Sequence, residues 1–489
     1  MPLVPALAQQ RSAKRGVCWD EKTQTLTDAT LSKMSPGIAW LYTWGETPVG
    51  QTSLLDADGG IAFLPMTWNG DFDEAKLRAY LSAHPGARYL LAFNEPNLSG
   101  SVGGSAMTPQ QAATAWPKVK QLAADFHLQL VAPALNFTGD NVGGRIWEPF
   151  AWYDEFFRLC PDAGVDFLAF HTYMNYYSAV DWVASRYFYS DADDADLLTA
   201  ANRAQYPHLV AYLEAYQAAN GHYPKMFLTE FCSYQGNEYP YTSAITLDFQ
   251  IDQMTQKVQL LEQSELVEGY AWFMANPAGG ETAWPYMSLF QRNTSDSELS
   301  ALGTVYVYMS SFDTSKYYQP GELIQASDYV NATTGEQAVR LRPNSDAASS
   351  CPLQVELVAS AYTTYLVELA EAGTYVLTLR AKSAATNTIG IYGDNFQRLL
   401  REEVPSTGGQ WKEVTLTLSL PAGKSELTVF SAQPSFFING LRLSAVTDGI
   451  DAPRSEAAPQ ACYTLGGQRV GGTRRPGIYV QQGRKVVVR

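Results

Sequence analysis

The 489-residue chain has no apolar run as long as a membrane span, and it is short of basic residues. Lys and Arg number 34 against 49 Asp and Glu, which gives a formal net charge of -15. This balance argues against binding to nucleic acid or to anionic membrane surfaces. It is compatible with a neutral polymer such as a polysaccharide.

Cysteine is also scarce, and the five residues are scattered as Cys18, Cys160, Cys232, Cys351 and Cys462. They form neither a CxxC pair nor a dense disulfide framework, so we interpret them as small buried hydrophobic residues, and one isolated disulfide stays open. An HExxH motif, a Walker-type loop and a dinucleotide fingerprint are absent too. We therefore expect neither a metal nor an organic cofactor.

The first residues have the form of a shortened signal peptide. Ala6-Leu7-Ala8 has the small-x-small pattern of a cleavage site and follows apolar residues, but a basic segment before it is missing. We interpret residues 1–14 as a leader and expect a secreted, cell-surface or periplasmic protein of bacterial type. An ordinary mobile N-terminus is the alternative.

Apolar runs alternate with amphipathic segments between residues 15 and 312. The candidate strands are Gly16–Trp19, Ile38–Trp44, Ile61–Met66, Tyr89–Asn94, Gln129–Leu135, Phe167–Thr172, Met226–Thr229 and Tyr270–Met274. Between them the pattern predicts helices, including Phe72–Ala83 after an Asp71 cap and Pro109–Phe126 after a Thr108 cap. Eight such units favour an α/β fold, a closed (β/α)8 TIM barrel.

The pattern changes after the barrel. Residues 313–446 are rich in Thr, Val and Tyr with period-two alternation and turn clusters, which predicts an antiparallel β-sandwich. Residues 447–460 contain Pro453 and Pro459 and are typical of a linker. Residues 461–489 hold two short strand runs, and we expect a small β tail there.

Two glutamates each close a buried strand. Glu95 follows the run 89–94 and Glu230 follows the run 225–229, so they end the fourth and seventh candidate strands. Strand C-termini of a parallel barrel converge on one mouth, where catalysis takes place. Paired carboxylates are what glycoside hydrolysis needs, and a retaining enzyme needs them about 5 Å apart. A solvated loop carboxylate is the alternative for each.

Aromatic and polar residues near these strand ends are candidate substrate contacts. Trp44, Trp68 and Trp272 fall at or just past strand C-termini, and their rings could stack on sugar faces. His171 and Tyr173 end the sixth strand. We expect Tyr173 to contact Glu230 or the substrate, while His171 could tune a pKa, bind a sugar hydroxyl or be a hydrogen-bonded core residue.

Asn94-Glu95-Pro96 at strand four, with Glu at strand seven, resembles the clan A retaining glycoside hydrolases. More narrowly, residues 15–310 resemble glycoside hydrolase family 128, which forms (β/α)8 barrels and cleaves β-1,3-glucans. The matching blocks are KRGVCW (14–19), WLYTW (40–44), FLPMTW (63–68), LAFNEPN (91–97), VAPA (131–134), DFLAFHTY (166–173), LTEF (228–231) and GYAWF (269–273). The resemblance implies Glu95 as acid/base, Glu230 as nucleophile and Asn94 as a ligand of the sugar 2-hydroxyl.

The second domain resembles family 6 and related carbohydrate-binding modules. The blocks that carry this resemblance are LIQASDY (323–329), YLVELAEAGTY (365–375), GQWKEV (409–414) and FFINGLRL (436–443). It implies a framework role for Trp411 and makes Tyr392 and Phe396 candidate ligand contacts. Gln325-Ala-Ser327 replaces the usual acidic block, so a sandwich that binds no glycan is a real alternative.

The main hypothesis is an endo-acting, retaining β-1,3-glucanase. Its partner is a β-1,3-glucan polysaccharide or oligosaccharide, and we expect a monomer with no nucleic acid and no membrane span. One alternative is a clan A enzyme that cleaves β-1,4-linked glucan or mannan. The other is a glucan-binding protein without catalytic activity.

Overall fold

The structure is a computed structural model that describes residues 9–50, 52–173, 200–232 and 246–446, together with four short strands near the C-terminus. The chain divides into two compact units, residues 1–444 and 445–489. None of the described helices combines the length and the apolar character needed to cross a bilayer. The predicted division at residue 312 lies inside the first unit and stays a prediction.

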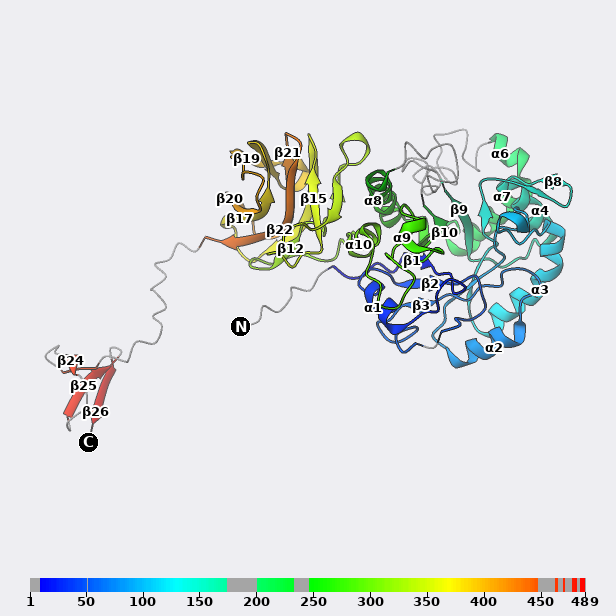
Figure 1. The fold of residues 1–489 in the computed structure, drawn as a ribbon, viewed down its shortest axis with the longest axis horizontal. Coiled ribbons are helices and arrows are strands. Elements are labelled where there is room, and N and C mark those ends of the chain that lie inside the picture. Colours follow the sequence, from blue (N-terminus) through cyan, green and yellow to red (C-terminus); the bar gives the residue numbers. More distant parts are fainter. Residues whose placement is uncertain are drawn as a thin grey trace. The chain divides into compact units, whose positions relative to one another are not determined.

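The first unit begins with a parallel sheet in which nine strands alternate with helices (Figure 1). Along the sheet the order is β3-β2-β1-β11-β10-β9-β5-β4, with β6 beside β9. The strands are β1 (Arg15–Cys18), β2 (Trp40–Tyr42), β3 (Ala62–Phe63), β4 (Tyr89–Leu91), β5 (Gln129–Val131), β6 (Leu135–Asn136), β9 (Phe167–Thr172), β10 (Lys225–Phe231) and β11 (Val267–Trp272).

The two ends of this order also meet. Met66, just beyond β3, forms an isolated parallel bridge with Leu91 of β4. The Leu91 amide donates to the Pro65 carbonyl and the Thr67 amide donates to the Leu91 carbonyl, both at 2.9 Å. The predicted strand 129–135 is split into β5 and β6, which flank Pro133, a residue without an amide donor.

Helices follow most of the strands. They are α1 (Asp28–Met34), α2 (Glu74–Ala83), α3 (Pro109–Asp125), α4 (Pro149–Leu159), α6 (Ala200–Gln205), α7 (Pro207–Asn220), α8 (Leu247–Gln263), α9 (Gly280–Ala283) and α10 (Ala301–Tyr308). Thr108 caps α3 in a capping box, as predicted. The predicted Asp71 cap of α2 is wrong, because the Asp73 side chain accepts from the Lys76 amide and α2 begins at Glu74.

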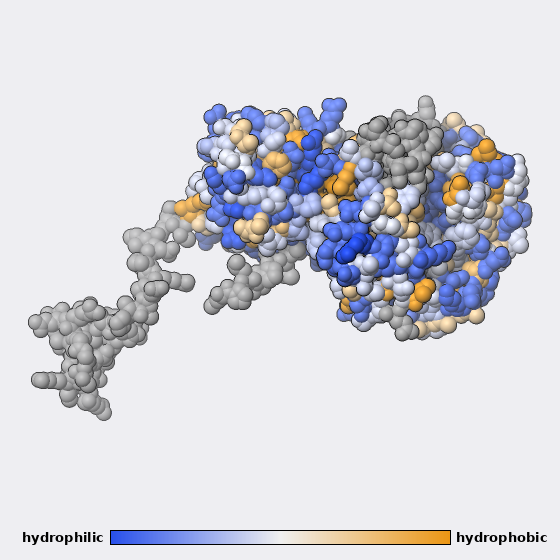
Figure 2. Space-filling view, in the orientation of Figure 1, coloured by the Kyte–Doolittle hydropathy of each residue, from blue (hydrophilic) through white to orange (hydrophobic). Residues whose placement is uncertain are grey.

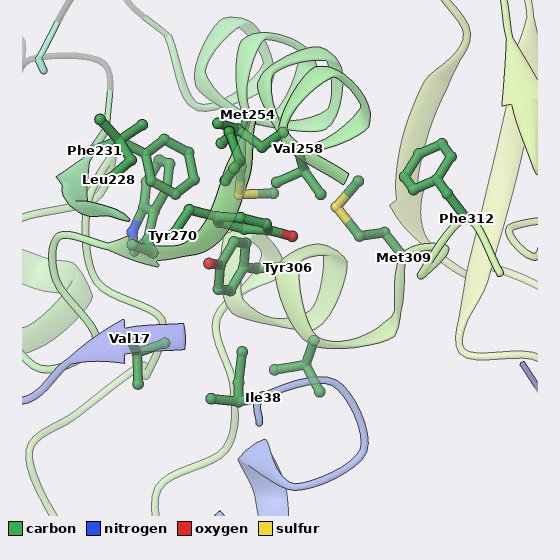
Figure 3. Packing of buried hydrophobic residues seen from close by; sticks show 14 of the residues in the cluster. Val17, Ile38, Leu228, Phe231, Met254, Val258, Tyr270, Tyr306, Met309 and Phe312 are labelled. Carbon is green, nitrogen blue, oxygen red and sulfur yellow. The ribbon is translucent and has the colours of Figure 1, made fainter. Parts of the chain in front are cut away.

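The buried side chains form two hydrophobic layers. One layer lies inside the parallel sheet and contains Tyr42, Leu91 and Phe227. The other layer packs the outer side of the sheet against helices, and Figure 3 shows part of it, where Met254 and Val258 of α8 face Phe231 and Tyr270. Strand alternation decides which layer a residue joins, since successive side chains point to opposite faces.

The second part of this unit is an antiparallel sandwich, as predicted. One sheet has the order β14-β15-β22-β17-β20 with β12 beside β22, and the other has the order β13-β16-β21-β18-β19. The first sheet comprises β12 (Leu323–Gln325), β14 (Arg340–Pro343), β15 (Leu353–Leu357), β17 (Gly373–Lys382), β20 (Lys412–Leu420) and β22 (Phe436–Ala445). The second comprises β13 (Asn331–Ala332), β16 (Ala361–Leu369), β18 (Asn387–Tyr392), β19 (Arg398–Val404) and β21 (Gly423–Ser431).

One side of α8 binds the sandwich through polar contacts. Arg342 of β14 bonds to Asp252 at 2.7 Å, and Gln259 donates to the carbonyl of Ala332 at 3.0 Å. Gln9, in the predicted leader, donates to the carbonyl of Asp328. The surface seen in Figure 2 is largely hydrophilic with scattered apolar residues, as expected for a surface that is in contact with water.

The described residues of the second unit form four short antiparallel strands. They are β23 (Cys462–Thr464), β24 (Arg469–Val470), β25 (Gly477–Gln481) and β26 (Arg484–Val488), in the order β24-β23-β25-β26. The assignment of residues 461–489 as a separate β tail stays a prediction.

Candidate active site

Glu230 reaches the interior of the parallel sheet through a β-bulge. In β10, Phe227 points into the sheet interior and Leu228 points outward, so strict alternation would turn Glu230 outward. The pairing with β9 shifts register between Leu228 and Glu230. This bulge turns Glu230 inward and returns Phe231 to the outer layer, and bulges re-aim side chains in this way.

Three donors hold the buried Glu230 carboxylate. The Tyr42 hydroxyl donates to Oε1 at 3.0 Å and the Trp44 indole donates to Oε1 at 2.9 Å. The Tyr173 hydroxyl donates to Oε2, as expected from its position after strand β9. Only 3% of Glu230 is exposed, so these bonds replace the water that its charge would otherwise need.

Glu95 faces Glu230 from the loop after β4. Its φ of 40° lies in the left-handed region, which costs a non-glycine residue energy and is often found at functional sites. Oε1 of Glu95 accepts a hydrogen bond from the Asn136 amide at 2.7 Å and lies 2.7 Å from Nδ1 of His171. Asn136 ends β6, beside β9.

His171 lies between the two carboxylates and is completely buried. Its Nδ1 is 2.7 Å from Glu95 and 3.4 Å from Oε2 of Glu230, while Nε2 is 2.9 Å from Oγ1 of Thr229. One ligand atom from each of Glu95, His171 and Glu230 lies within 4.8 Å of the others. The two carboxylates therefore approach each other closely at the mouth of the sheet.

The same three residues are the group of described residues that could hold a metal ion. Nδ1 of His171 lies 2.7 Å from the Glu95 carboxylate, which is hydrogen-bonding distance, so the two side chains can satisfy each other directly. The expectation that no metal is needed stays a prediction.

Burial dominates the electrostatics of the site. It raises the pKa of Glu230, the nearby Glu95 adds to this, and His171, Tyr173 and Trp44 oppose it. Burial also disfavours a charged His171, but Glu230 and Glu95 outweigh it and raise the pKa of this imidazole. A negative charge on Glu95 therefore opposes a negative charge on Glu230.

Asn94 precedes Glu95 and is also buried. Its amide donates to the carbonyl of Gly103 at 3.3 Å. Its Oδ1 is a buried acceptor without a hydrogen-bond partner in the part of the chain that the structure describes. A sugar hydroxyl could satisfy this atom, which agrees with the predicted role of Asn94.

The predicted aromatic platforms differ in their placement. Trp44 and Trp68 are partly exposed and pack on the inner layer. Trp272 is not available to a sugar, because it is completely buried in the outer layer and its indole donates to the Met287 carbonyl. Alternation along β11 turns Trp272 outward and brings the next residue, Phe273, against Trp44.

Two site residues were missed by sequence reasoning. Tyr42 and Asn136 both contact a site glutamate, and each ends a short strand. Tyr42 lies within the sequence block that includes Trp44, and Asn136 follows the last residue of a predicted strand. Their position at strand ends was the signal that could have identified them.

Tyr176 and Tyr177, which follow Tyr173 in the chain, lie outside the described residues. Cys18 and Cys351 carry free, buried thiols, in line with the interpretation of cysteine as a small buried residue, whereas the free thiol of Cys160 is only partly buried. In the sandwich, the ring centroids of Tyr392 and Phe396 lie 6.2 Å apart. The Trp411 indole donates a hydrogen bond to the Ser345 hydroxyl.

Comparison with known proteins agrees with this geometry. The model of the glycosyl hydrolase catalytic core family matches residues 16–193 and 201–306, which is more than half of the chain. This chain belongs to the glycosyl hydrolase catalytic core family. The matched region contains the parallel sheet except for Arg15 and includes both glutamates, and the predicted resemblance to a glycoside hydrolase is confirmed.

Two individual proteins are similar to parts of this chain. A family 128 (subgroup II) endo-β-1,3-glucanase from Pseudomonas viridiflava is 31% identical, and the match covers 61% of this chain and 98% of that chain, with a TM-score of 0.42. Alkali-sensitive linkage protein 1 of Schizosaccharomyces pombe is 30% identical over 168 residues. That match covers 33% of this chain and only 26% of the yeast protein.

A solved carbohydrate-binding module is also similar to part of this chain. The C-terminal family 6 carbohydrate-binding module of LamC, a laminarinase from Zobellia galactanivorans, is 21% identical and is covered over 97% of its length with a TM-score of 0.22. The match covers 25% of this chain. TM-scores below 0.5 support no argument from superposition, so the family assignment depends on the sequence model.

Proposed function

We propose that this family member is an endo-acting, retaining β-1,3-glucanase with Glu230 as nucleophile and Glu95 as acid/base. The observation that carries the proposal is the close approach of two buried carboxylates in different surroundings. Glu230 accepts from two phenols and an indole, whereas Glu95 contacts an imidazole and an amide. Different surroundings separate the roles of paired carboxyl groups.

In the first step, Glu230 attacks the anomeric carbon and forms a glycosyl ester. The glycosidic bond breaks, and its oxygen takes the proton from Glu95. The phenols of Tyr42 and Tyr173 stay protonated at any working pH, because burial above all raises the pKa of both. They therefore serve as donors to Glu230 and not as acids.

In the second step, Glu95 takes a proton from water, and the oxygen of that water attacks the anomeric carbon. The ester bond to Glu230 breaks and its carboxylate returns, so each cycle leaves the enzyme unchanged. Asn94 would bond the sugar 2-hydroxyl with its unpartnered Oδ1, and such contacts strengthen in an oxocarbenium-like transition state.

The separation of the carboxylates supports retention over inversion. Oxygen atoms of Glu95 and Glu230 lie within 4.8 Å of each other. Retaining enzymes place the two carboxyl groups ~5–5.5 Å apart, whereas inverting enzymes need ~6.5–9.5 Å to admit water behind the sugar. A separation of this size favours the retaining arrangement.

The proposed substrate rests on sequence. The eight strand-end blocks resemble family 128, and the 31% identity to the Pseudomonas viridiflava enzyme extends over nearly its whole length. We also propose that the parallel sheet closes as a (β/α)8 barrel, supported by the bridge between Met66 and Leu91. Secretion and a monomeric state are further proposals, and they depend on the first residues and on composition alone.

A nucleophile variant tests the proposal. Glu230→Gly should lose hydrolysis of laminarin-type oligosaccharides, and azide should restore turnover of an activated substrate by forming a glycosyl azide. Glu95→Gln should still form the glycosyl ester, the first step, on substrates whose leaving group needs no proton. Near-normal hydrolysis by Glu230→Gly would show that the assignment is wrong.

A panel of polymers tests the linkage. We expect turnover of linear β-1,3-glucan and weak or no turnover of β-1,4-glucan and β-1,4-mannan. Strong activity on a β-1,4 polymer with none on β-1,3-glucan would replace the proposed substrate. A mixture of oligosaccharides released early from a long chain would support internal cleavage.

A further inference from the structure

Tyr42 and Cys18 lie beneath Glu230, and neither takes part in bond making or breaking in the two proposed steps. Both side chains are completely buried. Tyr42 comes from β2 and Cys18 from β1, which are neighbours in the sheet. With the carbonyl of Thr229 they form a small polar cluster inside an otherwise apolar layer.

The Tyr42 hydroxyl has one hydrogen and two acceptors within reach. Oε1 of Glu230 is 3.0 Å away and the Thr229 carbonyl is 3.2 Å away. A charged carboxylate is the stronger acceptor, so the hydrogen goes to Glu230 in the free enzyme. When Glu230 becomes a neutral ester, its pull weakens and the carbonyl can take the hydrogen.

Cys18 biases this choice. Its Sγ lies 3.4 Å from the Thr229 carbonyl and 3.4 Å from the Tyr42 oxygen. Burial raises the pKa of the thiol well above its ordinary value, so the S–H remains a donor. A thiol that donates to Thr229 partly satisfies the competing carbonyl and leaves the phenol hydrogen to Glu230.

We propose that Tyr42 is a positioning residue that assists the departure of Glu230 from the glycosyl-enzyme, and that the Cys18 thiol directs its hydrogen to Glu230. The inference rests on the proposed retaining function. Charge returns to Glu230 in the second step, when the ester bond breaks, the water oxygen bonds to the sugar and Glu95 takes the proton. A hydrogen bond to Oε1 stabilises that returning charge.

The other titratable groups around Glu230 must be accounted for in any pH measurement. They are Glu95 after β4, His171 in β9, Tyr173 directly after β9 and Cys232 after β10. The variants of the test leave these four groups unchanged, so the contribution of the four groups to the pH profile is the same in all variants.

The test is the kinetics of Tyr42→Phe on an activated aryl laminaribioside, for which the second step limits turnover. We expect kcat and KM to fall together by on the order of 10- to 100-fold, because the ester accumulates and a bond to a charged group is lost. The acidic limb of the kcat/KM profile should move to higher pH, since Glu230 loses a donor that favours its charged form.

Two further variants separate this role from damage to the fold. Tyr153→Phe is the matched control, because its buried hydroxyl bonds to backbone groups of Pro133 and Ala169 and, among the described residues, to no side chain. It should keep the kinetics of the parent enzyme. Cys18→Ala should move the acidic limb of the kcat/KM profile in the same direction as Tyr42→Phe, but by less. Cys18→Ser keeps a donor at this position, so it should return the limb to the position found for the parent enzyme.

The outcomes are distinguishable from a failure of the proposed function. If Glu230→Gly is inactive and rescued by azide while Tyr42→Phe leaves KM and the acidic limb unchanged, the inference about Tyr42 is overturned and the function stands. If Tyr42→Phe lowers kcat with KM unchanged and to the same extent as Tyr153→Phe, the role of Tyr42 is structural and the inference is also overturned.

Discussion

Each donor around Glu230 contributes to the same task, which is to keep a carboxylate charged where burial opposes its charge. Removal of the donor leaves the charge poorly solvated, and a hydrogen bond to a charged group contributes about 1.5–3 kcal/mol. The effect on activity should therefore depend on whether an aromatic side chain touches the carboxylate. Trp44 and Trp272 allow this comparison, because both were predicted as platforms and only Trp44 contacts Glu230.

Trp44→Phe should lower kcat by about tenfold or more, because the indole donor at 2.9 Å from Glu230 is lost while an aromatic ring is kept. Trp272→Phe should instead lower the unfolding free energy by about 2 kcal/mol, because it leaves the buried Met287 carbonyl without its donor and creates a cavity. Steady-state kinetics and thermal unfolding of both variants provide the check. Equal loss of kcat in the two would contradict the assignment.

Asn136 should act on Glu95 in the same way. Asn136→Asp replaces the amide donor 2.7 Å from Oε1 by a second negative charge. The lost donor and the added charge disturb the group that is proposed to give its proton to the leaving oxygen, so kcat/KM on an unactivated oligosaccharide should fall by about tenfold or more. The fall should be smaller on an activated aryl glycoside, whose leaving group needs no proton. An equal loss on the two substrates would show that Asn136 does not act on the acid/base.

At the scale of single elements, sequence patterns succeeded where the signal is local. Thr108 and Pro109 predicted the start of α3, because a capping side chain and proline act on adjacent backbone groups. The bulge in β10 could not be predicted, because strict alternation would have turned Glu230 away from the interior. The sequence identified the residue, and long-range pairing with β9 determines where it points.

The start of α2 gives a test at this scale. Asp73→Ala should reduce the unfolding free energy by about 1 kcal/mol, because it removes the acceptor for the Lys76 amide. Asp71→Ala is the control, since Asp71 is exposed and precedes the cap by two residues. Chemical denaturation of both variants distinguishes them. If Asp71→Ala were the more destabilising change, the helix would begin where the sequence pattern placed it.

At the scale of the whole molecule, apolar runs that alternate with helical segments predicted the parallel sheet. Period-two alternation and turn clusters predicted the sandwich that follows it. The contact of Tyr173 with Glu230 was expected, but the contacts of Tyr42 and Asn136 with the two glutamates could not be predicted. These contacts depend on the order of strands in the sheet, and spacing along the chain does not give that order. The two glutamates were singled out because each follows a predicted strand.

Stability of the first unit should depend on pH through Asp328 of the sandwich. Burial raises the pKa of this carboxyl to about 6, although Tyr318 donates to it at 2.7 Å. The unfolded pKa is about 3.9, so the stabilising contribution of the protonated form is present below that pH and is lost as pH rises through about 6. At neutral pH Asp328 therefore costs up to about 3 kcal/mol.

Asp328→Asn removes this titration and keeps an acceptor for Tyr318. The variant should gain thermal stability over the parent as pH rises from 4 to 7.5, while the exposed Asp58→Asn should show no such trend. Unfolding midpoints measured in parallel across this range are the readout. A difference between variant and parent that does not change with pH would contradict the raised pKa.

The stereochemistry of the first product tests the central claim most directly. Proton NMR of a β-1,3-gluco-oligosaccharide during the first minutes of hydrolysis records which anomer is released before mutarotation. Two carboxylates with oxygens within 4.8 Å predict the β-anomer, because two displacements restore the original configuration. Initial release of the α-anomer would mean a single displacement by water, and the proposed roles of Glu230 as nucleophile and Glu95 as acid/base would be wrong.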